Sequence, residues 1–173
     1  IEGSDPVLKN EYIVFTAHLD HLGQGAAVAG DTIYNGAFDN ATGIAVMLEV
    51  ARYFSELQRK PRRALLFLAV TAEESGMLGS EYFAKHPTVP RGAIVANINT
   101  DLPLALTAVG DVIGFGAEHS SLGDVVARAV RAEGMAISPD PMPEEVFFVR
   151  SDQISFVREG IPAVYLDFGG QSR

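Results

Sequence analysis

The sequence predicts an α/β fold, a three-layer sandwich whose central sheet is mostly parallel and has helices on both faces. Strand-like apolar runs alternate along the chain with segments of helical periodicity. The run from Ala64 to Thr71 is apolar throughout, which is typical of a central parallel strand covered on both sides. Each connection between parallel strands must pack back across the sheet, so the helices are expected to form the outer layers.

The expected elements follow in a regular order. Strands are expected at 12–18, 64–71, 93–99 and 161–168, with a shorter one at 104–109. Helices are expected at 41–58, about 77–85 and up to Glu133, with a helical turn or two at 152–158. The glycine-rich stretch 23–36 and the proline-rich stretch 138–145 follow neither period and are expected to be loops.

Two helices carry recognisable start signals. In the helix over 41–58, apolar residues recur at helical spacing while charged residues fall on the other face, and Asn40 or Thr42 is available as the cap. Ser121 and Asp124 form a capping-box pattern that predicts the start of the helix ending near Glu133.

Composition limits the classes of function. The 173 residues are 47% hydrophobic and carry a net charge of −9, so we expect one domain, residues 1–173, with no nucleic-acid partner. Cysteine is absent, so a metal site must use His, Asp and Glu. No apolar run is long enough to span a membrane. The chain begins without Met and stops directly after a strand-like run, so we expect a piece of a longer protein, truncated at both ends.

Ionisable side chains follow several of the expected strands. His18 and Asp20 follow the first strand, Glu73 and Glu74 the second, and Asp101 the third, while Asp39 directly precedes the long helix. Functional groups in open α/β sheets collect at the carboxyl ends of strands. Five unpaired carboxylates at one edge would repel one another, and divalent cations would remove that repulsion. The pattern therefore predicts a metal site.

The spacing of these residues suggests separate tasks. Successive side chains in extended backbone point in opposite directions, so Glu73 and Glu74 can differ in role, one binding metal and the other acting as a base. His18 and Asp20 point the same way in extended chain, so a carboxylate can orient a ligating imidazole there.

Five segments together resemble the successive motifs of the family-28 zinc aminopeptidases, of the bacterial leucyl-aminopeptidase type that usually carries an upstream protease-associated domain. They are TAHLDHLG (16–23), GDTIYNGAFDNATG (30–43), TAEESGMLGSEYF (71–83), NINTD (97–101) and RSDQISFVREGIPAVYL (150–166). The resemblance covers nearly the whole chain in the same order. It implies a zinc-exopeptidase-like fold, a peptide substrate with a free N-terminus and, by analogy, a secreted or periplasmic location.

The resemblance also implies roles for individual residues. His18, Asp39 and Asp101 would hold one zinc ion, and Asp39 would bridge to a second ion bound by Glu74. Glu73 would be the general base toward a zinc-activated water, and Asp20 would support His18. The Asp39–Asn40 peptide bond would be cis.

One departure concerns the second zinc ion. The family uses a further histidine downstream of the GIPA strand, and residues 1–173 do not reach it. His21 remains open between a place at the pocket mouth and a place packed in a loop. Two other functions therefore stay in view: a single-zinc acyltransferase like the glutaminyl cyclases, and a peptidase-like binding domain without catalysis. The presence of both Glu73 and Glu74 argues against the latter.

Overall fold

The computed structural model describes residues 1–103 and 108–169 and is built around a six-stranded sheet. The strand order is β4-β1-β5-β8-β6-β7. The strands are β1 (Tyr12–His18), β4 (Ala64–Val70), β5 (Ile94–Asn99), β6 (Asp111–Phe115), β7 (Ala136–Ser138) and β8 (Ala163–Phe168). Their pairings are parallel except that β6 runs antiparallel to β8. The predicted mostly parallel sheet is confirmed.

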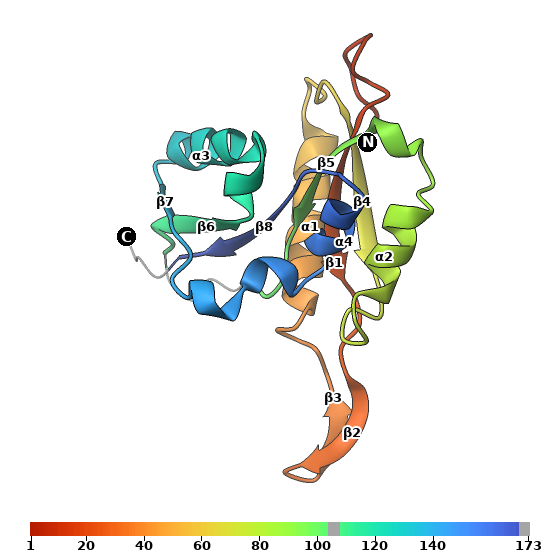
Figure 1. Cartoon of the computed structure of the whole chain (residues 1–173), viewed down its shortest axis with the longest axis vertical. Coiled ribbons are helices and arrows are strands. Elements are labelled where there is room, and N and C mark those ends of the chain that lie inside the picture. The colour runs from red at the N-terminus through yellow and green to blue at the C-terminus, as the bar shows by residue number, and fades with distance from the viewer. Residues whose placement is uncertain (104–107, 170–173) are drawn as a thin grey trace.

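Helices cover both faces of this sheet (Figure 1). They are α1 (Ala41–Glu56), α2 (Leu78–Lys85), α3 (Leu122–Ala132) and α4 (Gln153–Arg158), with single 3₁₀ turns at Arg91–Ala93, Ala117–His119, Pro143–Glu145 and Phe147–Val149. On one face, Val14 packs in a cluster with Phe83 of α2 and Phe156 of α4. On the other face, Val164 packs against α3 through Val126 and Val130. The helix α1 contacts β1 and β4.

The start of α1 is held by Asn40, one of the two caps that the sequence allowed. Its side-chain oxygen accepts a hydrogen bond from the Gly43 N–H at 3.0 Å. Thr42 instead donates its hydroxyl to the Phe38 carbonyl. The helix ends at Glu56, two residues earlier than expected. The cap places the first turn of α1, and Asp39 before it, at the carboxyl end of the sheet.

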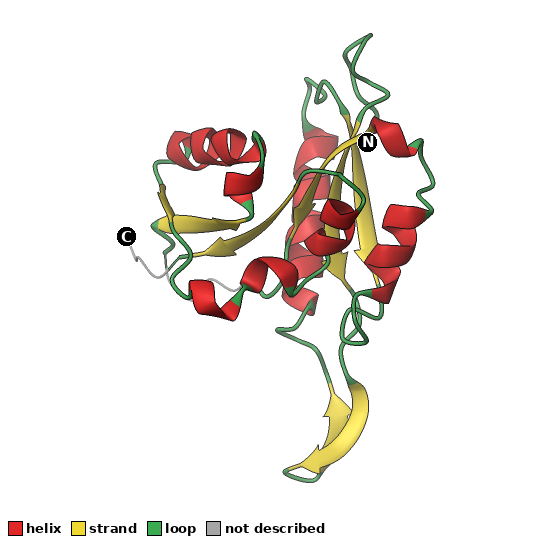
Figure 2. Cartoon of the chain, viewed as in Figure 1, coloured by secondary structure: helices red, strands yellow, loops and turns green. Residues whose placement is uncertain are grey.

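The expected loop over 23–36 is wrong, because most of it forms an antiparallel hairpin of β2 (Gly23–Val28) and β3 (Asp31–Tyr34). The hairpin projects away from the sheet (Figure 2). Its two-residue turn, Ala29 and Gly30, has positive φ at both positions, as a type I′ turn requires. Nearly every residue of both strands is exposed, so no face needed apolar residues and no alternation marked the strands in the sequence.

Two smaller expectations also changed, and a third lies mostly outside the described residues. Residues 104–107 of the expected strand at 104–109 lie outside the described residues, and the next strand of the sheet, β6, begins only at Asp111. Ser121 makes no side-chain capping bond; the neighbouring Ser120 hydroxyl accepts from the Leu122 N–H instead. The proline-rich loop contains a 3₁₀ turn, and β7, three residues long, was too short to predict.

Candidate metal centre

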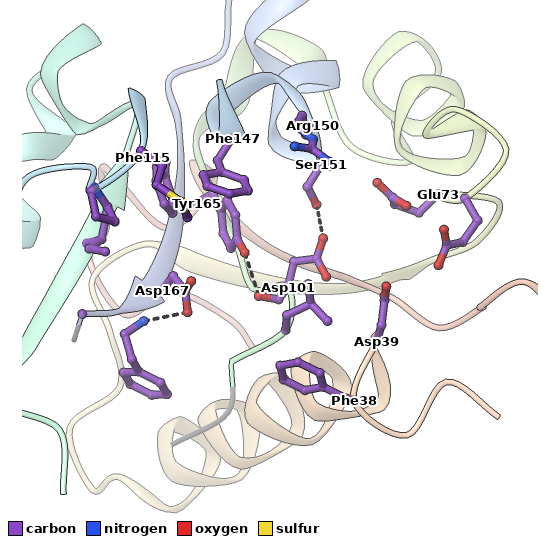
Figure 3. A pocket seen from close by; sticks show the side chains of 17 residues that line it. Phe38, Asp39, Glu73, Asp101, Phe115, Phe147, Arg150, Ser151, Tyr165 and Asp167 are labelled. Atoms are coloured by element: carbon purple, nitrogen blue, oxygen red, sulfur yellow. Dashed lines mark hydrogen bonds between the residues drawn. The ribbon is translucent and has the colours of Figure 1, made fainter. Parts of the chain in front are cut away.

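The candidate site lies at the carboxyl ends of β1, β4 and β5, which are neighbours in the sheet. Parallel pairing brings the ends of these strands to one edge. His18 is the last residue of β1, and the segments after β4 and β5 carry Glu73, Glu74 and Asp101. Asp39 joins them from the start of α1, and Figure 3 shows its carboxylate turned toward the same space as that of Asp101. The structure thus assembles the side chains that the sequence singled out.

A first group consists of His18, Asp39 and Asp101. The Nε2 atom of His18 lies 3.1 Å from Asp39 Oδ1 and 3.2 Å from Asp101 Oδ1. One donor atom from each residue falls within 4.8 Å of the other two, close enough to share one ion. The imidazole is buried. The Asp39–Asn40 peptide bond is cis, as the resemblance implied.

A second group consists of His21, Asp39 and Glu74, whose donor atoms are similarly close. The Nδ1 atom of His21 lies 2.7 Å from Glu74 Oε1 and 3.8 Å from Asp39 Oδ2. Asp39 therefore faces both groups, with Oδ1 toward the first and Oδ2 toward the second. The sequence left the position of His21 open, and the structure places it among the potential ligands.

Local backbone geometry leaves room for His21. Gly36 has φ +67°, and a Cβ atom at this position would lie 2.7 Å from the His21 Cβ. A larger residue at position 36 would therefore displace the imidazole. His21 lies three residues beyond His18, the last residue of β1, and this closeness to the strand end is the sequence signal that could have indicated it as a ligand.

Asp101 is held by a buried polar network that the sequence analysis did not identify. Ser151 donates its hydroxyl to Asp101 Oδ2 at 2.6 Å, and Tyr165 donates its hydroxyl to the Asp101 carbonyl at 3.0 Å. The Asn99 amide in turn donates to Ser151 and to Gln153. Fully satisfied networks of this kind fix side-chain orientation. The Asp101 Oδ1 atom is thereby left free to face His18.

The two adjacent glutamates are separated by a turn and not by strand alternation. Ala72 has positive φ, and the Glu73 carbonyl accepts hydrogen bonds from the Gly76 and Met77 N–H groups. The expectation of extended backbone here is therefore wrong, although the two side chains still have different surroundings. Glu74 belongs to the second ligand group, whereas Glu73 belongs to neither and lines the same pocket.

Asp20 supports His18 differently from the expectation. The Nδ1 atom of His18 lies 2.9 Å from the main-chain carbonyl oxygen of Asp20, so its N–H donates there when Nδ1 carries the proton. The Asp20 carboxylate is farther away, with Oδ1 at 4.0 Å. A carbonyl acceptor fixes the tautomer that leaves Nε2 free to bind a cation. The orienting group is thus the backbone of Asp20.

The titration behaviour of the site follows from burial and crowding of charge. Burial acts to lower the pKa of His18, but the contact with Asp101 and the charge of Glu73 outweigh it and raise this pKa to about 9. Burial raises the pKa of Glu73 to about 7, with the charges of Asp152, Asp101 and Glu74 adding to the effect and that of His18 opposing it. Burial, then Asp101 and Glu74, also raise the pKa of Asp39.

These shifts and contacts fit a site for divalent cations. Within residues 1–103 and 108–169, no lysine or arginine forms an ion pair with Asp39, Glu74 or Asp101. Imidazole nitrogen and carboxylate oxygen are the donors that zinc accepts. Both groups could hold an ion: His18, Asp39 and Asp101 around the first, and His21, Asp39 and Glu74 around the second.

Asp152 and Gln153, the two residues that follow Ser151, have buried side chains. Gln153 is fully buried and donates its amide to the Phe148 carbonyl at 2.7 Å, so it supports the network beneath Asp101. Asp152 directly precedes α4, but its side chain makes no capping hydrogen bond to the helix. Its carboxylate oxygens are buried without a hydrogen-bond partner among the described residues, and burial raises its pKa to about 6.

A pocket opens beside the two ligand groups. Its volume is about 640 Å³, within the range of small-molecule sites. The carboxylates of Asp39, Glu73, Glu74 and Asp101 line one side. Phe115, Phe147 and Tyr165 lie across the pocket from Glu73 (Figure 3). The pocket therefore joins an acidic side, which includes the potential metal ligands, to an aromatic side.

Known proteins share this fold, and some also share part of the sequence. The structure superimposes on an aminopeptidase from Aneurinibacillus sp. strain AM-1 with a TM-score of 0.69 and 25% identity, over 99% of this chain and 38% of that chain. A glutaminyl cyclase from Bacteroides thetaiotaomicron gives a TM-score of 0.69 and 19% identity, over 92% of this chain and 60% of that chain. A probable zinc metalloprotease of Pyrenophora tritici-repentis is 39% identical over 67 residues, 39% of this chain and 15% of that protein.

The mixed, mostly parallel sheet with potential metal ligands at its carboxyl edge is consistent with a metallopeptidase. The sequence profile of peptidase family M28 matches residues 1–173, and the chain belongs to this family. The chain spans less than two thirds of the length of each of the three proteins just compared, from 15% to 60%. None of the described helices is both long and apolar enough to cross a bilayer.

Proposed function

We propose that this chain is the catalytic part of a zinc-dependent aminopeptidase, which removes residues from the free N-terminus of a peptide. The observation that supports this proposal is that three acidic residues of the pocket belong to the ligand groups and a fourth does not. Asp39, Glu74 and Asp101 each belong to a ligand group, while Glu73 lines the same pocket and belongs to neither. A carboxylate beside the ligands but free of them is available for proton transfer.

Zinc held by the two groups would supply Lewis acidity toward a water molecule and toward the scissile carbonyl. His18, Asp39 and Asp101 would hold one ion, and His21, Asp39 and Glu74 the other. The network through Ser151 and Tyr165 keeps Asp101 in position, which a ligand set needs in order to bind without reorganisation.

Glu73 is the general base of this scheme. Its carboxylate accepts the proton of the attacking water and then gives it to the departing amine of the peptide. Burial raises the pKa of Glu73 above its ordinary value, and a carboxylate with a raised pKa takes up a proton more readily than an exposed one. Burial, the main cause of the raised pKa, also keeps bulk water from competing for that proton.

Family membership and the aminopeptidase fold support hydrolysis at a peptide bond. The glutaminyl cyclase neighbour shares the fold alone at 19% identity, so it does not by itself favour a cyclase reaction. The second ligand group, which includes His21, favours the two-ion hydrolase over a single-zinc acyltransferase. Both ligand groups have their carboxylates in place, which counts against a binding domain without catalysis.

The test uses the full natural chain, loaded with zinc, and a set of short peptides. We expect release of the N-terminal residue, and no release when the N-terminus is acetylated. Glu73→Gln should lower kcat by about 100- to 10,000-fold with unchanged zinc content, because the side chain loses its base but is not a ligand. Glu118→Gln, at an exposed position outside the pocket, is the matched control and should keep full activity.

Other outcomes would redirect or end the proposal. Pyroglutamate formation from N-terminal glutamine, with no residue released, would replace it with the acyltransferase. Release from the C-terminus or from the acetylated peptide would contradict the aminopeptidase. Full turnover by Glu73→Gln would remove Glu73 from the role of base.

A further inference from the structure

The aromatic side of the pocket contains one carboxylate, that of Asp167. The ring centroid of Phe115 lies 5.1 Å from that of Tyr165 and 5.6 Å from that of Phe147, so the three rings form a continuous wall. Asp167 follows Tyr165 by two positions on β8, and side chains two apart on a strand share a face. Figure 3 shows Asp167 on this side, across the pocket from Glu73.

Asp167 has little to compensate its charge. Its Oδ1 atom accepts one hydrogen bond from the Phe168 N–H at 2.7 Å. In the part of the chain that the structure describes, no lysine, arginine or histidine forms an ion pair with it. Burial raises its pKa, and the charge of Asp101 adds to this. A half-buried carboxylate of this kind is stabilised when a cation enters the pocket.

Arg150 also lines the pocket but does not neutralise this wall. Its guanidinium forms an ion pair with Glu145 at 3.1 Å and lies over the Phe147 ring, 5.4 Å from the centroid. More than half of the Arg150 side chain is exposed to solvent. Its charge is thus balanced by Glu145 at the rim, and the interior of the aromatic side keeps the negative charge of Asp167.

We propose that Asp167 is a specificity-determining residue that selects peptides beginning with lysine or arginine; this inference rests on the proposed aminopeptidase function. The aliphatic part of such a side chain packs along the rings of Phe115, Phe147 and Tyr165, and its cationic end pairs with Asp167. Long basic side chains bury their methylene groups on apolar surface in this way, and aromatic rings attract the cation as well.

The α-amino group of the substrate does not compete for Asp167. This group is two bonds from the scissile carbonyl carbon, so it must lie beside the carbonyl that Glu73 and the ligand groups serve. Asp167 lies on the other side of the pocket from Glu73. The side chain of the first residue, which extends away from the scissile bond, is the part of the substrate that reaches the aromatic side.

The experiment compares N-terminal lysine, arginine, norleucine and leucine 4-nitroanilides on the zinc-loaded full chain. Norleucine matches the lysine stem without its charge. We expect kcat/KM for lysine to exceed that for norleucine by about tenfold or more, since a charge-assisted contact is lost. Asp167→Asn should bring the two to within about threefold, mainly by lowering the lysine value. Asp124→Asn on α3 makes the same change of net charge outside the pocket and should keep the wild-type ratio.

Isothermal titration with free L-lysine and L-norleucine gives a readout independent of turnover. Wild type should bind lysine more tightly, and Asp167→Asn should lose that difference. Equal kcat/KM for lysine and norleucine in the wild type, or an unchanged ratio in Asp167→Asn, would overturn the role of Asp167 while leaving aminopeptidase function intact. If none of the four substrates is cleaved, the proposed aminopeptidase function fails. In that case, equal affinity of the wild type for lysine and norleucine would also overturn the selection of basic side chains by Asp167.

Discussion

At the scale of single residues, burial decides what each ionisable group of the site does. His18 is almost completely buried. Its ring is held in one orientation by the Asp20 carbonyl at Nδ1 and the Asp101 carboxylate at Nε2. Glu73 is half-buried and belongs to neither ligand group, and burial raises its pKa to about 7. The two adjacent glutamates therefore have different surroundings, because the turn between β4 and α2 gives their side chains different neighbours.

Zinc content tests the two ligand groups directly. We expect the wild-type full chain to retain two zinc ions after dialysis and His21→Ala to retain fewer, because the second group loses the nitrogen donor that residues 1–173 supply. Asp39→Asn should lose zinc from both groups, since its two oxygens face different groups. Inductively coupled plasma mass spectrometry measures the ratio of zinc to protein.

His119→Ala provides the matched control, because His119 is exposed and is absent from both ligand groups. It should keep the wild-type zinc content. Equal zinc in His21→Ala and His119→Ala would exclude His21 as a ligand. Full zinc retention by Asp39→Asn would contradict the bridge between the two groups.

At the scale of elements, the turn into α1 connects folding to the site. The Asn40 side chain caps the helix at Gly43, accepts from the Leu102 N–H at 3.0 Å and donates to the Thr100 carbonyl at 3.1 Å. It thereby ties the residues around Asp101 to the start of α1. One buried amide thus holds Asp39 and Asp101, from segments far apart in the sequence, at the same edge.

Replacing this amide tests that link. Asn40→Ala should lower the free energy of unfolding by about 2 to 3 kcal/mol, from loss of the cap and from buried N–H and C=O groups left unpaired. Urea denaturation in EDTA measures this without the contribution of zinc. Asn35→Ala, on an exposed residue whose amide bonds only the nearby Ile33 carbonyl, should cost less than about 0.5 kcal/mol. Similar losses in both variants would contradict the role given to Asn40.

At the scale of the whole molecule, the chain carries a net charge of −9, and several of its carboxylates are concentrated at one edge of the sheet. The pKa values of Glu73 and Asp152 are raised to about 7 and 6, and that of His18 to about 9. Each of these groups binds protons more tightly in the folded than in the unfolded chain. Stability of the metal-free chain must therefore fall as pH rises through these values.

Thermal unfolding in EDTA tests whether the stability of the metal-free chain falls as pH rises. The midpoint should be higher at about pH 5.5 than at about pH 8.5, because Glu73, Asp152 and His18 lose protons that stabilise only the folded state. Zinc should reverse the trend, since protons compete with the ion for the same donors. Saturation at 100 times the dissociation constant would add about 2.7 kcal/mol at the higher pH. A metal-free chain that is more stable at pH 8.5 would contradict the raised pKa values.

More of the fold than of the candidate site could be predicted from the sequence. Buried strands such as 12–18 and the amphipathic helix from 41 were predictable because burial imposes a period on the side chains. The β2–β3 hairpin was not, because its strands are exposed and no period was imposed. Potential ligands were predictable where they directly follow strands whose ends must meet, as with His18 and Asp101.

Local pattern in the chain settles the class of fold, the kinds of ligand and the edge of the sheet where they gather, because periodicity and strand ends are properties of neighbouring residues. Only the folded chain decides that His21 turns toward Glu74, that Ser151 and Tyr165 hold Asp101, and that Asp167 faces the pocket. The contacts of His21 with Glu74 and of Ser151 with Asp101 join residues that are 50 or more positions apart in the sequence. Their geometry depends on loop paths and on packing across the sheet, which leave no period in the sequence.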